Sequence, residues 1–141
     1  MNVAPCPVAF ERRRAAVAAV LKARGRQAPL RAEGRAFAPA NIALCKYWGK
    51  RDRVLNLPIT SSVSISLGPL GTHTVVRPAE RDHFCLNGAE LASETEEARR
   101  LADYLDLFRS EQIPAFEVRS HNTLPTAAGL ASSASAFAAL A

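Results

Sequence analysis

The sequence has few of the residues that build disulfide frameworks and zinc sites. Its cysteines are an odd number without CxxC spacing, at Cys6, Cys45 and Cys85. This pattern argues against a disulfide scaffold and against a structural zinc site. The three histidines also lack metal-ligand spacing, so we assign no metal site to histidine. Cysteine usage of this kind fits a reducing cytoplasm.

Long apolar runs are also absent. No stretch approaches the roughly 20 consecutive apolar residues that a membrane helix requires, so we expect no membrane span. The chain is nevertheless 48% hydrophobic and 22% charged, a balance that disfavours disorder. A length of 141 residues suits one domain with a single core.

Acidic residues are scarce before position 36, where only Glu11 and Glu33 occur. The net charge of +5 permits binding to nucleic acid or to acidic small molecules and does not choose between them. If the basic segment bound nucleic acid or a partner, deleting residues 1–35 would abolish a salt-sensitive signal. We expect no such signal. The basic residues of this segment are Arg12, Arg13, Arg14, Lys22, Arg24, Arg26, Arg31 and Arg35.

Residues 8–24 read as a helix with an apolar stripe at Val17, Val20 and Leu21, and residues 27–34 read as a linker. An arginine-rich start is also typical of an organelle transit peptide, but the serine enrichment of such peptides is missing. We therefore interpret residues 1–35 as a basic N-terminal extension and residues 36–141 as the domain.

The remainder alternates between strand and helix patterns. We expect a strand over 35–47 with a break at Pro39, and a hairpin that joins strands 62–67 and 72–77 through Gly68 and Gly71. A tight hairpin follows over 83–91 about Asn87-Gly88. Ser93 or Thr95 caps a helix over 96–109, and 115–120 forms the next strand. These elements predict an α+β domain.

The segment PTAAGLASSAS at 125–135 is a loop of small residues that opens an alanine-rich helix near residue 130. Small side chains let backbone N–H groups approach an anion, and a helix start adds unpaired donors and a positive dipole end. Phosphate is the usual ligand there, and serine hydroxyls can reach a phosphate-bound Mg²⁺. The alternative is a serine-capped buried helix without a ligand, and the loop by itself does not decide.

A cationic segment, KYWGKRD, begins at Lys46. Lys46 and Lys50 with Tyr47 between them could be a strand end with solvated lysines. A ligand with a diphosphate and a carboxylate would instead need such cations and hydroxyls close together, because desolvating its charge is costly without partners. Trp48 receives no role.

Three segments together, 38–52, 55–67 and 120–135, resemble the diphosphomevalonate decarboxylase family of the GHMP kinase superfamily. The order and spacing of KYWGKRD, LPITSS and PTAAGLASSAS make this resemblance specific. It implies the N-terminal half of the GHMP kinase fold. The implied reaction is ATP-dependent decarboxylation of 5-diphosphomevalonate to isopentenyl diphosphate, with ATP and Mg²⁺.

The resemblance also implies roles for individual residues. Tyr47 and Lys50 match positions that bind the diphosphate region of the substrate, Asn41 matches an asparagine that organises the site, and Lys46 matches an active-site lysine. Ser132 or Ser133 matches the catalytic serine and is the candidate hydroxyl ligand of the metal. The implied ATP-binding residues are Pro125, Thr126, Ala127, Ala128, Gly129, Leu130, Ala131, Ser132, Ser133 and Ser135.

The chain also departs from the family pattern. The family's catalytic aspartate would lie beyond Ala141, so we expect an incomplete enzyme without decarboxylase activity by itself, and possible homodimers only at full length. The arginine that the family often carries after the 83–91 hairpin is replaced at the comparable positions by Glu96 and Glu97. A monophosphate-specific decarboxylase and a related GHMP small-molecule kinase therefore remain alternatives.

Overall fold

The computed structural model describes residues 7–23, 31–124 and 132–141 of the chain. The helices are α1 (Pro7–Ala23), α2 (Glu96–Leu105) and α3 (Ser132–Leu140), and the strands are β1 (Gly34–Cys45), β2 (Lys50–Asp52), β3 (Leu57–Pro58), β4 (Val63–Ala79), β5 (His83–Leu86), β6 (Ala89–Glu90) and β7 (Ala115–Asn122). A five-stranded sheet has the order β1-β4-β7-β5-β6, and β2 and β3 form a separate two-stranded sheet. Among the strands of the described residues, only β5 and β7 pair in parallel. The α+β prediction is confirmed.

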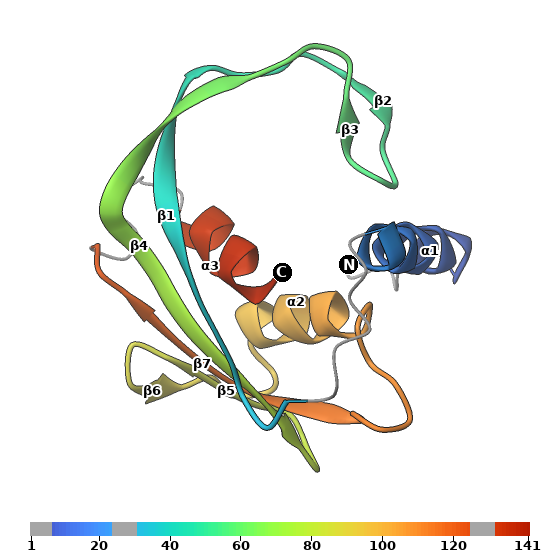
Figure 1. The fold of residues 1–141 in the computed structure, drawn as a ribbon, viewed down its shortest axis with the longest axis vertical. Helices are drawn as coiled ribbons and strands as arrows, with labels where there is room; N and C mark the ends of the chain where they lie inside the picture. Colours follow the sequence, from blue (N-terminus) through green and yellow to red (C-terminus); the bar gives the residue numbers. More distant parts are fainter. Residues whose placement is uncertain (1–6, 24–30, 125–131) are drawn as a thin grey trace.

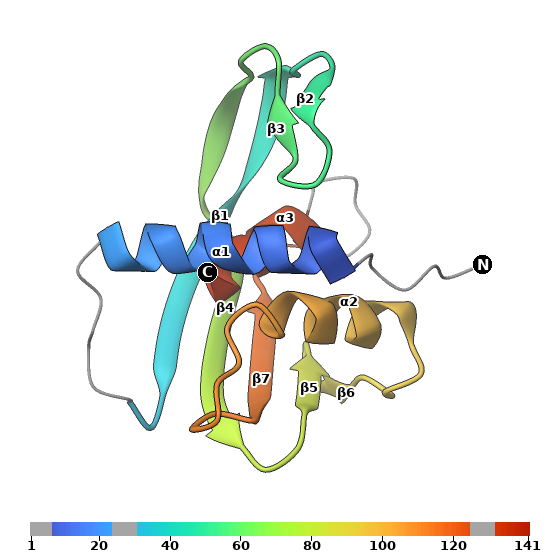
Figure 2. The ribbon, with the colours of Figure 1, turned by 90° about the vertical axis from the view of Figure 1, so that its right-hand side faces the viewer.

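The large sheet curves around the helices. Figure 1 shows β1 and β4 as the long wall of a curved shell, with α2 and α3 on its concave side. The small β2–β3 hairpin extends from the far end of this wall. Helix α1 crosses the open side between this hairpin and α2, as Figure 2 shows. Among the residues described, no helix combines the length and hydropathy needed to cross a bilayer.

The hairpin predicted through Gly68 and Gly71 is wrong. The structure has one strand of 17 residues, β4, that pairs with β1 on both sides of this segment. The register jumps from Pro39↔Gly71 to Asn41↔Ser66, so β4 takes up extra residues as a bulge instead of reversing direction. Gly68 adopts a φ of 61°, which glycine tolerates.

Strand β1 likewise continues through Pro39 without the predicted break. Pro39 lies where the register shifts, a position at which its missing N–H interrupts no regular ladder. Gly71 faces this site closely, because a Cβ there would lie 2.2 Å from the carbonyl oxygen of Ala38. Pro39 and Gly71 therefore shape an irregular pairing between two continuous strands.

The short-range turn and cap predictions are confirmed. Asn87 and Gly88 have positive φ values of 53° and 83° and join β5 to β6. Thr95 caps α2, since its hydroxyl accepts a hydrogen bond from the N–H of Ala98 at 3.2 Å. The helix ends at Leu105, however, and not at Arg109 as predicted. Arg109 is instead bonded to Asp82 and to the carbonyl of Pro114, outside the helix.

The core lies between the sheet and α2. Five buried residues form its centre: Phe84, Ala98, Leu105, Phe116 and Val118. The third helix, α3, packs on β1 and β4, and the small residues Ala38 and Ala40 of β1 are buried. This placement agrees with the alanine-rich buried helix predicted from near residue 130.

Helix α1 occupies nearly the predicted range but buries none of its residues. The predicted stripe of Val17, Val20 and Leu21 lines a shallow hollow together with Tyr104 and Phe108 of the α2 region. The helix therefore lies against the domain with its apolar side, and the contact is partial.

Candidate active site

The first set of predicted site residues meets at one hollow. Asn41 of β1 lines it with Lys46 and Tyr47, which follow the end of that strand. Ser62 and Ser64 complete the wall, and the volume is about 440 Å³. The amide nitrogen of Asn41 donates to Oγ of Ser64 at 3.2 Å, which fixes the amide across the two strands.

Lys50 lines a second hollow, also of about 440 Å³, with Tyr47, Gly49 and Arg53. Tyr47 belongs to both hollows, so they adjoin at its ring. The two together present amide, hydroxyl and cationic groups beside a comparable area of apolar surface. Such a lining suits an anionic ligand larger than one phosphate.

The loop that carries Lys50 is shaped by local hydrogen bonds. Oδ1 of Asp52 accepts from the N–H groups of Val54 and Leu55, both at 2.9 Å. These bonds close a turn directly after β2, as aspartate commonly does. The N–H of Leu55, and next the guanidinium of Arg12, lower the pKa of Asp52 below its ordinary value. Asp52 therefore stays ionised at neutral pH and holds the turn.

The other end of this loop is fixed in the same manner. The N–H of Trp48 donates to Oγ1 of Thr60 at 2.8 Å, and the N–H of Ile59 donates to the carbonyl of Gly49 at 3.3 Å. Gly49 has a φ of 66°, and the Ile59 side chain covers it. The sequence motif KYWGK thus becomes a turn of defined shape, in which glycine is required at position 49.

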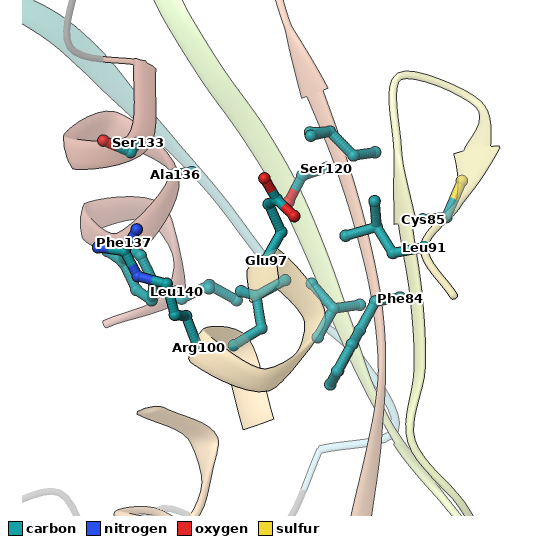
Figure 3. Close-up of a pocket in the computed structure, with 13 residues that line it drawn as sticks. Phe84, Cys85, Leu91, Glu97, Arg100, Ser120, Ser133, Ala136, Phe137 and Leu140 are labelled. Atoms are coloured by element: carbon teal, nitrogen blue, oxygen red, sulfur yellow. The ribbon is translucent and has the colours of Figure 1, made fainter. Parts of the chain in front are cut away.

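The predicted serines lie on α3. Ser132 is the first residue of this helix, and Ser133 is exposed in its first turn. Ser133 lines a cavity of about 130 Å³ between α2, α3 and the sheet, separate from the hollows at Tyr47. Figure 3 shows this cavity, with Glu97 and Arg100 of α2 at its side and Phe84 and Leu91 toward the sheet. The remaining predicted ATP-binding residues, 125–131, lie outside the described residues.

Ser135 has a different environment from the one expected of an ATP-binding residue. It is 2% exposed, and its Oγ lies 2.8 Å from Oγ1 of Thr72 on β4. The Thr72 hydroxyl in turn donates to Oδ1 of Asn122 on β7 at 2.8 Å. The Ser135 side chain therefore joins α3 to the sheet, and its hydroxyl is turned away from solvent.

Sequence reasoning missed three polar lining residues, Arg53, Ser62 and Ser64. The signal for the serines was present, because Ser62, Ser64 and Ser66 alternate with apolar residues and so share one face of a strand. No comparable local signal marks Arg53, which lies in the turn between β2 and β3. Its place in the hollow depends on how this turn folds back.

Comparison with known proteins shows the family of this chain. Residues 38–141 match the family model described as the diphosphomevalonate decarboxylase-like N-terminal domain. The chain belongs to the diphosphomevalonate decarboxylase-like family. All of the predicted site residues lie within the matched segment, whereas α1 precedes it.

Individual relatives of this diphosphomevalonate decarboxylase-like chain agree with the family assignment. Diphosphomevalonate decarboxylase of Candida albicans is 44% identical over 118 residues, which cover 73% of this chain and 33% of the relative. The crystal structure of mevalonate diphosphate decarboxylase from Staphylococcus aureus superposes with a TM-score of 0.68 at 43% identity, over 77% of this chain and 34% of that protein. The chain thus spans about a third of the length of the curated relatives it matches.

Some of the similar structures contain bound ligands. A protein named MDDEF, solved in complex with MVAPP, AMPPCP and magnesium, has a TM-score of 0.63 and 40% identity to this diphosphomevalonate decarboxylase-like chain. The match covers 77% of this chain and 34% of that protein.

Proposed function

We propose that this chain contributes the binding groups of an ATP-dependent decarboxylase that converts 5-diphosphomevalonate to isopentenyl diphosphate, ADP, phosphate and CO₂. The observation that carries this proposal is the convergence of Asn41, Lys46 and Tyr47 on one hollow, next to the hollow of Lys50. Membership of the family supports it. We place the enzyme in the cytoplasm, without nucleic-acid or membrane partners and with the homodimer as its full-length form.

In this proposal Tyr47 and Lys50 bind the diphosphate, and Asn41 and Lys46 orient the part of the substrate that reacts. Their role is to align a highly charged molecule and to offset its charge, which is the main task in phosphoryl transfer. The γ-phosphoryl group passes to the tertiary hydroxyl oxygen. The electron pair of the bond to the carboxylate carbon then forms the alkene as CO₂ and phosphate leave.

The groups at the start of α3 suit the phosphates of ATP. A helix of nine residues that begins with two serines offers N–H donors, a positive dipole end and hydroxyls to phosphate oxygens. Among the residues described, no group of three His, Cys, Asp or Glu side chains can hold a metal ion. We propose that Mg²⁺ is held through the phosphates of ATP, with the hydroxyl of Ser132 or Ser133 as a protein ligand.

Calorimetric titration of the 141-residue chain with 5-diphosphomevalonate tests the proposal. We expect Lys50→Ala to weaken binding about tenfold, since it removes a charge-assisted hydrogen bond. Arg81→Ala is the matched control, because it removes one positive charge from an exposed turn without a described ion pair. Equal losses of affinity in Lys50→Ala and Arg81→Ala would contradict a specific role of Lys50, because the net charge alone would then explain the result. Tighter binding of mevalonate 5-phosphate than of the diphosphate would favour the monophosphate-specific alternative.

A further inference from the structure

Helix α1 lies outside the segment that matches the family, yet it contacts the β2–β3 hairpin that carries Lys50. Its apolar residues Val17, Val20 and Leu21 line one shallow hollow with Tyr104 and Phe108. Its arginines reach the β2–β3 hairpin on the other side. Figure 2 shows the helix crossing between these two parts of the molecule. The helix therefore links the packed body to the hairpin that carries Lys50.

Two hydrogen bonds make the contact with the hairpin. Nη2 of Arg12 donates to Oδ2 of Asp52 at 2.6 Å, and Nε of Arg13 donates to the carbonyl oxygen of Val54 at 2.9 Å. The other oxygen of Asp52 holds the turn amides of Val54 and Leu55. One carboxylate thus fixes the shape of the turn with one oxygen and its attachment to α1 with the other.

The charges of the hairpin give this contact a second effect. Lys50, Arg51 and Arg53 surround Asp52 in the sequence, and any of them could neutralise that carboxylate. Arg12 pairs with Asp52 instead. In the part of the chain that the structure describes, Lys50 and Arg53 then make no ion pair and line their hollow as available cations.

We propose that α1 is a positioning helix for the β2–β3 hairpin, with Arg12 and Arg13 as positioning residues that present Lys50 and Arg53 to a diphosphate-bearing ligand. This proposal rests on the proposed function for the identity of the ligand. The ordering of the hairpin by α1 does not depend on that identity. The Arg12–Asp52 ion pair is partly exposed, so this half of the contact is sensitive to ionic strength.

The test compares variants of the 141-residue chain that carry one fewer arginine on the same helix. Arg12→Ala and Arg13→Ala each remove one contact with the hairpin, and their double variant removes both. Arg14→Ala is the matched control, because Arg14 is exposed and has no described partner. Far-UV circular dichroism verifies that each variant keeps its helices.

Two measurements read out the proposal. Amide hydrogen exchange at Val54 and Leu55, measured by NMR, reports how well the turn is ordered. Titration with inorganic diphosphate reports the affinity of the chain for this anion. We expect faster exchange and about fivefold weaker diphosphate binding in the double variant, from the loss of one ion pair and one hydrogen bond. Compared with Arg12→Ala, Arg12→Lys should show slower amide exchange and tighter diphosphate binding, because it restores the positive charge. Arg14→Ala should change neither measurement.

The outcomes separate this inference from the proposed function. Exchange rates and affinities in the double variant equal to those of Arg14→Ala would overturn the positioning role. If the unmodified chain bound no diphosphate at all, the proposed function would lose its support at Lys50. Amide exchange would then still decide whether α1 orders the hairpin.

Discussion

Different interactions stabilise the two ends of the molecule. At the end formed by β5, β7 and α2, apolar side chains are buried in one cluster around Leu105 and Val118. At the end formed by β2, β3 and the adjoining parts of β1 and β4, large apolar residues such as Leu44, Ile59 and Ile65 remain exposed. The first end is stabilised mainly by burial, and the second is shaped by turn hydrogen bonds. The candidate substrate residues belong to the second end, where we expect local opening to cost the least free energy.

The largest expected effect contrasts the same substitution at the two ends. Leu105→Ala should lower the free energy of unfolding by about 2–5 kcal/mol, since Leu105 is 3% exposed within the core. Leu44→Ala should cost less than about 1 kcal/mol, since Leu44 is 66% exposed. Urea unfolding measures both. Similar losses of unfolding free energy in the two variants would contradict the contrast between a packed end and an exposed end.

The junction between the two ends should be the next most sensitive place. Gly71→Ala would place a methyl group 2.2 Å from the carbonyl oxygen of Ala38, and backbone cannot yield as a side chain can. We expect a loss of about 1–3 kcal/mol in urea unfolding. Gly34→Ala is the control, because the space beside Gly34 is open. A neutral result at Gly71 would mean that the bulge adjusts freely.

An ion-pair cluster at the packed end should have a smaller effect. Arg109 donates to both oxygens of Asp82 and to the carbonyl of Pro114, and Asp82 also accepts from the N–H of Phe116. Arg109→Ala should cost about 1–2 kcal/mol, because both groups keep some contact with water. Urea unfolding at neutral pH measures this loss.

The same cluster predicts a dependence on pH. Burial would raise the pKa of Asp82, but the hydrogen bonds from Arg109 and Phe116 outweigh it and leave this pKa lowered. A lowered folded-state pKa contributes stability above the unfolded value of about 3.9, and this contribution is lost as pH falls through the folded value. Asp82→Asn should therefore flatten the acid side of the stability profile. An unchanged acid slope in this variant would contradict the assignment.

The smallest effect concerns the start of α2. Thr95→Ala removes the cap on the N–H of Ala98 and should cost about 1 kcal/mol. Thr95→Ser keeps the hydroxyl and should restore most of the loss. Thermal unfolding of the two variants distinguishes the cap from the packing of the threonine methyl group.

What the sequence predicted well depends on short-range chemistry. The Asn87-Gly88 turn and the Thr95 cap are set by neighbouring residues, and their patterns are visible in the chain. The continuity of β4, the attachment of Arg12 to Asp52 and the loss of the last turn of α2 depend on partners 27 to 41 positions away or on strand pairing. The resemblance predicted that Asn41, Lys46, Tyr47 and Lys50 belong together. It did not predict Arg53, nor the burial of Ser135.

The bond between Ser135 and Thr72 fixes the rotation of α3 about its own axis. Successive residues of an α-helix are about 100° apart, so Ser133 lies about 200° around the helix from Ser135. With Ser135 bonded to Thr72 of β4, Ser133 therefore points away from that contact, toward the cavity that it lines. Adding or removing one residue between Ser133 and Ser135 would change the angle between their side chains by about 100°. No rotation of α3 about its axis could then keep Ser135 at Thr72 and Ser133 in its present direction.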